Sequence, residues 1–421
     1  MNALLEELQW RGLVADSTDL DALSAHLDEG PITSYVGFDP TAASLHIGHL
    51  VQLMVVRRLQ AAGHHPLLLV GGSTGLIGDP KQTGERVMNP AEVVADWVER
   101  LREQMSAYVD LDGPNPVRFV NNYDWTANLS TLEFLRDVGK HFSLNRMLAR
   151  DVVARRLESG ISYTEFSYVL LQSLDYRELY RRHGVTLQTG AQDQWGNITA
   201  GIDFVRRTEG ATVHGLVTPL LTKADGTKFG KTESGTVWID GELTSPYAFH
   251  QFFLNSEDAK VIDYLKVFSS RDRDEIDHLA HLTETEPFRR AAQRALADDI
   301  TDLVHGVSER EAAVAAAAAL FGRGELSELP AHTLSLVATE VGAGTLARDA
   351  EMPTVLDALV ASGVVESKGA ARRAVNEGGA YLNNQKVTDP EMRLTEQDLL
   401  ADRFVVVRRG KRTVGMVDLG A

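Results

Sequence analysis

The chain has 421 residues, of which 43% are hydrophobic and 24% charged, so it has the composition of a soluble globular protein of two or three domains. Cys is absent, which excludes disulfides, thiolate metal sites and cysteine nucleophiles. The net charge of −17 does not exclude a nucleic-acid partner, because residues 353–421 hold ten Lys and Arg against nine Asp and Glu, and a local basic surface decides phosphate contact.

The first half of the chain alternates apolar runs with longer helical patterns. Strand-like runs lie at Ile32–Phe38, Pro66–Gly72 and Val117–Asn121. Helical spacing of apolar residues is found at Gly48–Ala62, Ala91–Tyr108 and Leu129–Val138. Strands that alternate with helices of this length predict parallel βαβ units and an α/β, doubly wound (Rossmann-like) sheet. Ligands of such sheets bind in the loops at the carboxyl ends of the strands.

Strand patterns fade after about Ser245. Helical patterns follow at Tyr247–Val267, Asp272–Leu282, Pro287–His305 and Glu309–Phe321. Residues 322–352 lack periodicity. The last segment mixes helical patterns at Thr354–Ser362 and Lys368–Glu377 with strands at Ala380–Leu382 and Arg403–Arg408. We therefore expect an α/β domain at 1–245, a helical domain at 246–325, a linker at 326–352 and a small α+β domain at 353–421.

The tetrad His46-Ile47-Gly48-His49 lies where the loop after the first strand enters its helix. A helix N-terminus offers free N–H groups and the positive end of its dipole to phosphate. The two imidazoles can donate hydrogen bonds to charge that develops on a transferring phosphate. Gly48 leaves room for a nucleobase to lie against the backbone. Two ordinary capping histidines would give the same pattern, so the tetrad alone does not establish that this helix start binds phosphate.

A second motif, Lys228-Phe229-Gly230-Lys231-Thr232, follows a turn signal at Asp225-Gly226. Together with Lys223, its lysines could clamp a polyphosphate as point charges on a loop that closes over the ligand. A solvated basic loop could have the same sequence pattern, so this motif alone does not establish polyphosphate binding either.

A third pattern lies in the helical segment Thr164–Arg182. Tyr168, Gln172 and Asp175 stand at i, i+4 and i+7, so one face of a single helix presents all three. A site for a small polar ligand needs such a face, although a solvated amphipathic helix has the same spacing. The glycine-rich run at 71–75 is not a P-loop, because no Gly-Lys-Ser/Thr follows it.

Taken together, the first two motifs form the paired signature of class I aminoacyl-tRNA synthetases, and the second is a variant of their K-M-S-K-S loop. The runs Tyr35–Thr41, Gly75–Pro80 and Asp193–Ile198 resemble those of bacterial tyrosyl-tRNA synthetases. The resemblance covers about residues 30–325 and extends more loosely to the end. It implies that ATP activates L-tyrosine as tyrosyl-adenylate and that tyrosine is then transferred to the 3′-terminal adenosine of tRNA(Tyr). It further implies Mg²⁺ on the nucleotide and no metal held by the protein itself.

The resemblance also implies roles for individual residues. Discrimination of a phenol from a phenyl ring requires buried partners for the hydroxyl, an effect for which tyrosyl-tRNA synthetases are the standard example. The tyrosine-binding set is Tyr35 and Asp175 for the hydroxyl, Asp79, Tyr168 and Gln172 for the ammonium, and Gln188 and Gln194 near the pocket wall and α-phosphate. The ATP-binding set is Gly37, Asp39, Thr41, His46, Gly48, His49, Asp193, Lys228, Phe229, Gly230 and Lys231. The catalytic set is His46, His49, Lys228, Lys231 and Thr232.

The C-terminal segment resembles S4-type RNA-binding domains at Ser367–Val375 and Gly378–Asn383. Lys368, Arg372 and Arg373 stand at near-helical spacing and would form a basic stripe for phosphate contact. A helix face neutralised by salt bridges is the alternative. The resemblance implies that the helical domain binds the anticodon and that the chain forms a homodimer, with Tyr163 near the interface.

Two other functions stay open from the sequence. A tryptophan-specific relative would share both motifs but would not need Asp175 for a phenol. A non-catalytic RNA-binding protein could keep the same scaffold. The N-terminus carries acids where a signal peptide needs bases, and no run approaches the roughly 18 apolar residues of a membrane span, so we expect a cytoplasmic protein without a membrane partner.

Overall fold

The computed structural model describes residues 1–81, 84–232, 235–348, 351–410 and 413–420, with the backbone alone for Lys231 and Thr232. These residues form two units. The first comprises residues 1–239 and 259–278, and the second comprises residues 240–258 and 279–421. None of the described helices is long and apolar enough to span a bilayer.

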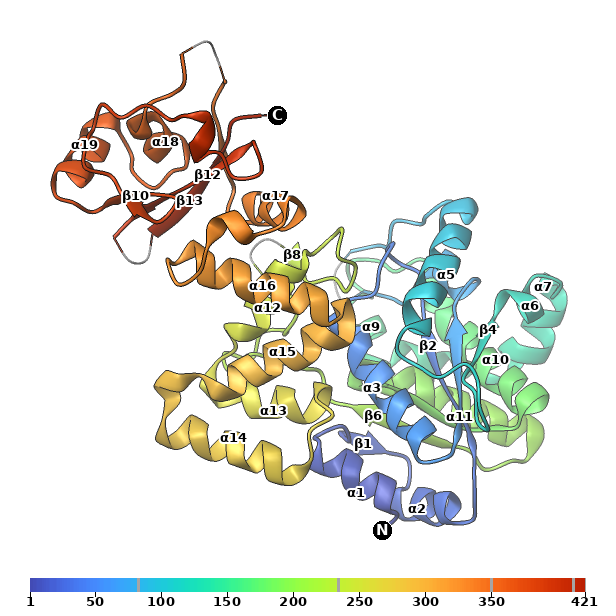
Figure 1. Cartoon of the computed structure of the whole chain (residues 1–421). Coiled ribbons are helices and arrows are strands. Elements are labelled where there is room, and N and C mark those ends of the chain that lie inside the picture. Colours follow the sequence, from blue (N-terminus) through green and yellow to red (C-terminus); the bar gives the residue numbers. More distant parts are fainter. Residues whose placement is uncertain (82–83, 233–234, 349–350, 411–412, 421) are drawn as a thin grey trace. The chain divides into compact units, whose positions relative to one another are not determined.

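The first unit is built on a six-stranded sheet of order β1-β6-β5-β2-β3-β4 (Figure 1). Its strands are β1 (Asp16–Ser17), β2 (Thr33–Phe38), β3 (His65–Val70), β4 (Arg118–Asn121), β5 (Val185–Ala191) and β6 (His214–Thr218). All neighbouring strands run parallel except β1, which is antiparallel to β6. The expected doubly wound sheet is confirmed. The chain leaves β2 towards β3 on one side and later fills β5 on the other, so the switch point at which ligands of such sheets bind lies at the carboxyl ends of β2 and β5.

Helices cover both faces of this sheet (Figure 1). One face carries α3 (Ile47–Ala61) and α5 (Ala91–Ser106), and the other carries α10 (Tyr163–His183) and α11 (Trp195–Glu209). The side chains of Tyr35, Leu67 and Leu69 pack against Tyr176 and Leu179 of α10. Because side chains alternate along a strand, the intervening residues of β2 and β3 face the opposite layer. The other described α-helices before residue 160 are α1 (Ala3–Trp10), α2 (Leu20–Asp28), α4 (Thr74–Ile77), α6 (Tyr123–Thr126), α7 (Thr131–Glu133), α8 (Leu144–Leu148) and α9 (Asp151–Ala154), and α7 continues into a π-helix (Phe134–Val138) and a 3₁₀ helix (Gly139–His141).

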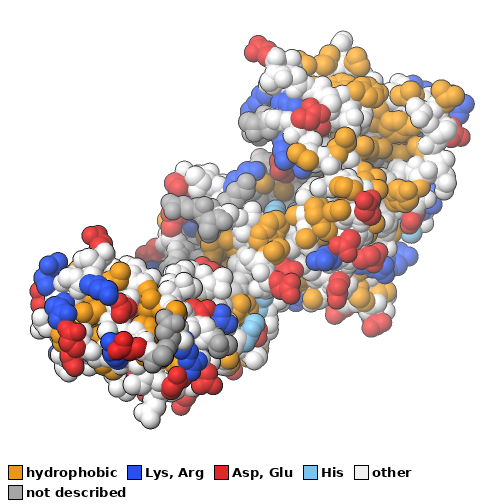
Figure 2. Space-filling view, turned by 90° about the horizontal axis from the view of Figure 1, so that it is seen from above, with side chains coloured by type: hydrophobic (Ala, Val, Ile, Leu, Met, Phe, Trp, Pro, Cys, Tyr) orange, Lys and Arg blue, Asp and Glu red, His pale blue; other side chains and the backbone are white. Residues whose placement is uncertain are grey.

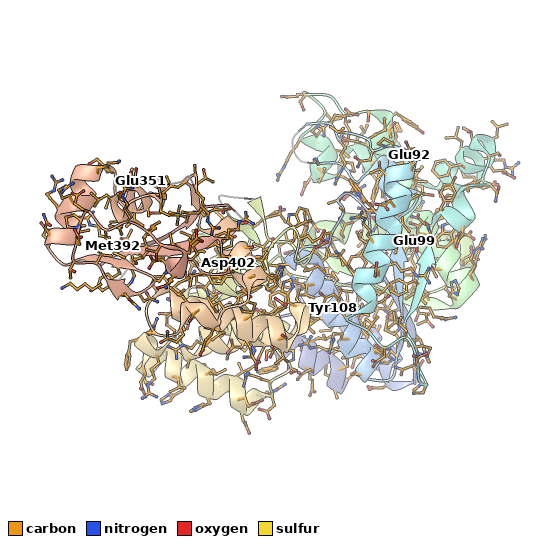
Figure 3. The ribbon with its side chains drawn as sticks, turned by 45° about the horizontal axis from the view of Figure 1, so that its top comes forward. Glu92, Glu99, Tyr108, Glu351, Met392 and Asp402 are labelled. Carbon is orange, nitrogen blue, oxygen red and sulfur yellow. The ribbon has the colours of Figure 1, made fainter. Side chains whose placement is uncertain are left out.

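Local sequence explains where the main helices begin and end. Ser162 caps α10 by accepting a hydrogen bond from the backbone N–H of Glu165, and Gly184, with φ +64°, ends it in the left-handed conformation. Along α5 the acidic side chains of Glu92 and Glu99 are exposed, whereas Tyr108, just after the helix, is buried (Figure 3). This amphipathic pattern is what directs one face of α5 to the sheet.

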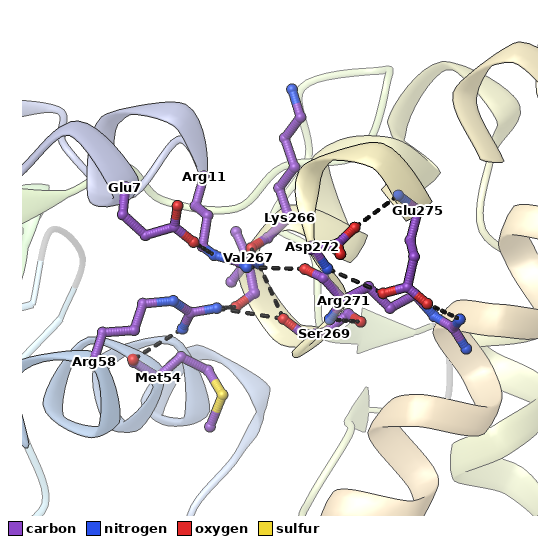
Figure 4. Close-up of polar contacts among 10 residues, drawn as sticks. All are labelled: Glu7, Arg11, Met54, Arg58, Lys266, Val267, Ser269, Arg271, Asp272 and Glu275. Carbon is purple, nitrogen blue, oxygen red and sulfur yellow. Dashed lines mark hydrogen bonds and ion pairs between the residues drawn. The ribbon is translucent and has the colours of Figure 1, made fainter. Parts of the chain in front are cut away.

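The structure differs from the single helix expected at 247–267. It contains α12 (Pro246–Leu254) and α13 (Asp258–Phe268), and α13 belongs to the first unit. The expected boundary at 245 therefore does not match the division of the structure. The physical reason is a set of hydrogen bonds from Arg11 and Arg58 to carbonyl groups at the end of α13 (Figure 4).

The second unit combines helices with a five-stranded sheet of order β11-β10-β12-β13-β9. Its larger helices are α12, α15 (Ala291–His305), α16 (Val307–Leu320), α17 (Ala331–Glu340), α18 (Val355–Ala361) and α19 (Lys368–Asn376), and α14 (Arg273–Thr285) runs into it. The strands are β9 (Gly344–Thr345), β10 (Ala380–Leu382), β11 (Gln385–Lys386), β12 (Phe404–Arg409) and β13 (Thr413–Asp418). Residues of α18 and α19 bury Val405 and Val407 on one face of the sheet, and residues of α16 and α17 bury Phe404 and Val406 on the other.

The segment expected as a linker, 326–352, differs from that expectation in its described residues. It contains α17 and β9, which pairs in parallel with β13. Leu334 and Val337 of α17 are buried with Phe404 and Met416. A ten-residue helix that packs through a few side chains leaves too short a periodic pattern to stand out in the sequence.

Candidate active site

The polar face expected on α10 contacts the segments that follow the carboxyl ends of β2 and β4. Tyr168 and Asp175 are buried, and Gln172 between them is partly buried. The hydroxyl of Tyr168 donates a 2.6 Å hydrogen bond to Oδ2 of Asp39, in the loop after β2. Asp175 reaches the segment after β4 through Asn122. The three spaced residues of α10 are therefore brought to the loops in which a ligand of this sheet binds.

Asp175 is the buried carboxylate at the base of this site. Its oxygens accept hydrogen bonds from Nδ2 of Asn122 (3.0 Å) and Nε1 of Trp125 (2.9 Å). Burial raises the pKa of Asp175 to about 7, although both hydrogen bonds act to lower it. An ionised carboxylate can accept about four hydrogen bonds, so positions remain for a further donor.

Three buried polar atoms near Asp175 have no hydrogen-bond partner among the residues that the structure describes. They are the hydroxyl of Tyr35, Oε1 of Gln172 and Oε1 of Gln188. Tyr35 and Gln188 face each other across the β2–β5 pair, and burial, followed by the charge of Asp175, raises the pKa of Tyr35. A buried unpaired polar group costs about 1–3 kcal/mol. Their grouping indicates a site completed by a small ligand with several polar groups.

Two further carboxylates, Asp39 and Asp79, lie on the same side of the sheet. Asp39 accepts hydrogen bonds from Tyr168 and, at 2.6 Å, from the hydroxyl of Thr74. Asp79 accepts from Nε2 of Gln194 (3.0 Å) and Nδ2 of Asn197 (3.2 Å). Burial raises the pKa of both carboxyls, and the charge of Asp79 raises the pKa of Asp39 further. Two partly buried carboxylates that repel each other favour a cation close to them.

The histidine tetrad occupies the start of α3. Nδ1 of His46 accepts from the backbone N–H of Gly48 (3.0 Å), and Nδ1 of His49 accepts from the backbone N–H of His46 (3.2 Å). The two rings stack with centroids 3.9 Å apart. Because each Nδ1 is an acceptor, the proton of each neutral ring is on Nε2, which is then a donor. Burial, followed by the charge of His46, lowers the pKa of His49, so this ring is neutral at pH 7.

Gly48 is exposed at the first turn of α3. A Cβ atom at this position would lie 2.9 Å from Cε1 of His46, so a side chain would displace the capping ring. The glycine therefore serves the histidine cap as well as leaving the backbone open. Gly71 is similar, since a Cβ there would lie 2.2 Å from Oδ1 of Asp39.

The second motif lies directly against the first. The backbone N–H of Ile47 bonds to the carbonyl of Val237 (3.4 Å), and that of Val237 bonds to the carbonyl of Gly230 (2.9 Å). His46 and Trp238 form an antiparallel bridge. Gly230 has φ +89°, which a residue with a side chain rarely adopts. The lysine motif and the histidine tetrad, more than 170 residues apart in the sequence, are thus joined by backbone hydrogen bonds.

The residues of the lysine motif differ in their contacts and in how much of each the structure describes. Lys228 is exposed, and its backbone bridges that of Thr222 across the turn. The ring of Phe229 is stacked on Tyr264 of α13. Lys231 and Thr232 form strand β7, and their side chains lie outside the described residues. Among the described side chains of the motif, the exposed Lys228 is therefore the one that an anionic ligand can reach.

The other expected nucleotide-binding residues line the same edge of the sheet. Gly37 is exposed near the end of β2, and Thr41 is exposed in the loop that follows. Asp193 is exposed in the short helix Gln192–Gln194 after β5. They lie in or just after β2 and β5, the strands on either side of the switch point.

Sequence reasoning missed the residues that hold the buried carboxylates. These are Asn122 and Trp125 for Asp175, Thr74 for Asp39, and Asn197 for Asp79. One signal was present, because Asn122 directly follows the predicted strand Val117–Asn121 and so lies at its carboxyl end. Trp125 carried no such signal, since an indole is more often a core side chain.

The expected RNA-binding residues lie on α19 in the second unit. Nζ of Lys368 is 2.5 Å from Oδ1 of Asp357, and Arg372 is 2.5 Å from Oε1 of Glu391. Arg373 is exposed. Lys, Arg, Asp and Glu side chains are interspersed on the face seen in Figure 2. Two of the three basic residues are thus paired with acids in the free protein.

Comparisons with known proteins agree with this geometry. The family model described as "tRNA synthetases class I (W and Y)" matches residues 27–322, and that of the "Tyrosine--tRNA ligase SYY-like C-terminal domain" matches residues 338–417. The tyrosine--tRNA ligase of Cutibacterium acnes is 69% identical over 99% of both chains. That of Streptomyces griseus is 56% identical over 100% of this chain and 99% of the relative. A C-terminally truncated mitochondrial tyrosyl-tRNA synthetase of Aspergillus nidulans has a TM-score of 0.67 at 30% identity, over 74% of this chain and 92% of that one.

Proposed function

The chain belongs to the class I tRNA synthetases and is a tyrosine–tRNA ligase, and from this premise we propose how its residues carry out the reaction. The tryptophan-specific and the non-catalytic alternatives are not favoured, because full-length relatives at 54–69% identity are tyrosine–tRNA ligases.

Two steps are required. In the first, a carboxylate oxygen of tyrosine attacks the α-phosphorus of ATP, the bond from this phosphorus to the bridging oxygen breaks, and pyrophosphate leaves. In the second, a ribose hydroxyl of the terminal adenosine of tRNA(Tyr) attacks the tyrosyl carbonyl, and AMP leaves. The protein forms no covalent bond, so catalysis depends on positioning and charge stabilisation.

We assign recognition of tyrosine to the buried polar site on α10. The phenol hydroxyl would donate to Asp175 and accept from Tyr35, whose own hydroxyl has no partner within the part of the chain that the structure describes. The ammonium would lie near Asp79, Tyr168 and Gln172. The unpaired oxygen of Gln172 supports this assignment, and so do the raised pKa values of the carboxyls of Asp39 and Asp79, which a nearby cation would lower again. Gln188 and Gln194 would complete the wall towards the α-phosphate.

The unpaired hydroxyl of Tyr35 beside the buried Asp175 is the observation that carries the substrate assignment. Phenylalanine would leave the hydroxyl of Tyr35 unpaired and would offer Asp175 no donor beyond Asn122 and Trp125, and tryptophan would place no hydroxyl there.

We assign charge stabilisation to the two signature motifs. His46 and His49 would donate from Nε2 to the α-phosphate oxygens as charge develops on them. Lys228, Lys231 and Thr232 would bind the departing pyrophosphate. Mg²⁺ would accompany the nucleotide phosphates and neutralise part of their charge. The phosphates of ATP carry several negative charges, and these cations and hydrogen-bond donors would stabilise them together.

The remaining nucleotide contacts fall on the loops around the switch point. Gly37, Thr41 and Gly48 are exposed and would let the nucleotide approach the backbone. Asp193 would bind the ribose hydroxyls. Asp39 would act near the adenylate through Tyr168, which it holds in place. Phe229 and Gly230 would contribute through the backbone, because the ring of Phe229 is occupied by its stack on α13.

The substrate is tested by ATP–pyrophosphate exchange with each of the twenty amino acids. We expect exchange with tyrosine and none above background with phenylalanine. Exchange with tryptophan but not tyrosine would overturn the assignment of the α10 site.

We also propose two partners for surfaces outside the candidate active site. Lys368, Arg372 and Arg373 would contact tRNA phosphates, together with the helical segment 246–325 for the anticodon. A second copy of the chain would cover the exposed apolar side chains between α7 and α10, namely Leu132, Leu135, Leu144, Leu148, Leu157 and Tyr163. These side chains come from one stretch of sequence, residues 132–163, and exposed apolar side chains that cluster on a surface commonly mark an interface. Since tRNA is its substrate, we propose the cytoplasm as the place of action.

A further inference from the structure

Helix α13 contacts the loop that carries the lysine motif, residues 221–230. The rings of Phe229 and Tyr264 are stacked, with centroids 3.9 Å apart and planes 26° from parallel. The hydroxyl of Tyr264 donates a 2.9 Å hydrogen bond to the carbonyl of Thr222. Tyr264 is 2% exposed. One buried side chain therefore contacts both strands of the loop, since Thr222 lies before its turn and Phe229 after it.

The end of α13 is fixed in turn by two arginines from the start of the chain (Figure 4). Arg11 donates to the carbonyls of Lys266 (2.8 Å), Ser269 (3.0 Å) and Arg271 (3.0 Å). Arg58 donates to the carbonyl of Val267 at 3.2 Å. Carbonyl groups at the end of a helix lack intrahelical partners, and positive charge there is favourable. Burial lowers the pKa of Arg58 to about 9, so the guanidinium still carries its charge at neutral pH.

Helix α3 contacts both the loop and α13. This helix begins at the histidine tetrad, and its first turn bonds to Val237, which bonds to Gly230 at the end of the loop. Near its other end, Arg58 holds α13. The loop is therefore supported from α3 by two routes. One is direct, through the backbone at 237, and the other is indirect, through α13 and Tyr264.

We propose that Tyr264 is a positioning residue for the lysine loop, setting the place of the loop relative to the histidines of α3. This inference rests on the proposed function of the loop in binding pyrophosphate. Lys228 neighbours Phe229 in the sequence, so the stack fixes the backbone from which its side chain reaches the ligand. Correct placement of a charged group is worth most in the transition state, and a displacement of about 1 Å can cost on the order of 100-fold in rate.

The test compares Tyr264→Leu, Tyr264→Phe and Phe229→Leu with the wild type in single-turnover formation of tyrosyl-adenylate. We expect Tyr264→Leu to slow adenylate formation on the order of 10–100-fold. Tyr264→Phe keeps the stack and loses one hydrogen bond, so a loss of only several-fold is expected. The dissociation constant of tyrosine should stay within about twofold in all three variants, because tyrosine binds on α10. Asp263→Ala is the matched control, since Asp263 is an exposed neighbour on the same helix.

Two further measurements separate positioning from a general structural role. In the reverse reaction, the KM for pyrophosphate should rise in Tyr264→Leu. The losses in Tyr264→Leu and Phe229→Leu should not add in the double variant, because both remove the same stack. Additive losses, an unchanged rate in Tyr264→Leu, or equal losses in tyrosine affinity and rate would each overturn the proposal. A wild-type protein without tyrosine-dependent exchange would instead overturn the proposed function, so the two failures are distinguishable.

Discussion

Nε1 of Trp125 donates a 2.9 Å hydrogen bond to Oδ1 of Asp175, and so ties the buried carboxylate of helix α10 to the segment that follows β4. Asn122 holds the second oxygen of the same carboxylate at 3.0 Å. Both donors favour the ionised form of Asp175 against the burial that opposes it. The carboxylate that we propose as the partner of the tyrosine hydroxyl is therefore held by two residues that need not touch tyrosine themselves.

This arrangement predicts a pH dependence of tyrosine binding. The pKa of Asp175 in the folded protein is about 7, above its ordinary value, so its acceptor form is lost as pH falls through about 7. We expect tyrosine affinity to fall between pH 8 and pH 6 as Asp175 gains its proton. Trp125→Phe removes a donor to the carboxylate, raises this pKa further and should move the transition to higher pH. Titration calorimetry across this range checks it, and a wild-type affinity independent of pH would contradict it.

The same raised pKa predicts a change in stability. Ionisation of Asp175 is less favourable in the folded chain than in the unfolded chain, so the free energy of unfolding should fall as pH rises from about 4 to about 7 through this group. In Asp175→Asn this contribution is absent. The difference in unfolding free energy between wild type and variant, measured by urea denaturation, should therefore depend on pH within that window. A difference that stays constant from pH 4 to pH 7 would rule out Asp175 as the titrating group.

Tyr35 offers a test in which stability and affinity change in opposite directions. Its hydroxyl is buried without a hydrogen-bond partner among the described residues, so Tyr35→Phe should leave the free energy of unfolding unchanged or raise it by about 1 kcal/mol. The same change should weaken tyrosine binding roughly tenfold and leave phenylalanine binding unaffected. Tyr176→Phe is the matched control, because the hydroxyl of Tyr176 donates to the carbonyl of His214 at 2.7 Å. Its loss should destabilise the fold by about 1 kcal/mol.

His46 has a structural and a proposed catalytic role that substitution can separate. Asn is a good N-cap residue, so His46→Asn should keep a cap on Gly48, whereas His46→Ala should destabilise the fold by about 1 kcal/mol. Both variants lose the Nε2 donor, and both should slow adenylate formation on the order of 100-fold. Thermal unfolding and single-turnover kinetics give the two readouts. Recovery of the rate in His46→Asn would show that the ring serves as a cap alone.

The buried ion pair of Arg156 and Glu165 should be a strong determinant of stability. Their charged atoms are 3.1 Å apart and both side chains are nearly inaccessible, and Arg156 also donates to the carbonyls of Lys81 and Gly84. Arg156→Met would leave Glu165 buried and unpaired, which costs about 3–5 kcal/mol. Chemical denaturation measures this loss.

Arg136 supplies the control for this prediction, because it forms an exposed pair with Asp137. Arg136→Ala should leave the denaturation midpoint unchanged. A comparable loss of stability in both variants would show that burial does not decide the strength of these pairs.

The sequence predicted those parts of the site in which spacing along one element fixes the geometry. Tyr168, Gln172 and Asp175 lie on one helix, so their common face followed from helical periodicity. The histidine tetrad likewise lies at the helix start that the pattern indicated. Their neighbours could not be predicted in the same way. Asn122 reaches Asp175 across 53 positions of the chain, and no local pattern encodes such a contact.

The division into units was missed for a related reason. Helix α13 has an ordinary amphipathic pattern, which indicates that one face is buried but not what buries it. Its place is set by Arg11, whose contact with Lys266 spans 255 positions. The same holds for α17, whose partners Phe404 and Met416 lie more than 60 residues further on.

The position of α13 has a consequence for how the protein is made. During synthesis, residues up to 245 emerge with both signature motifs, yet without the helix on which Tyr264 and the partners of Arg11 and Arg58 reside. The catalytic unit extends to residue 278 and can complete its packing only when that length has left the ribosome. Until then, the buried Arg11 and the partly buried Arg58 lack the carbonyl groups to which they donate. The nascent chain should therefore become protease-resistant in this region after residue 278 has emerged, and not after residue 245.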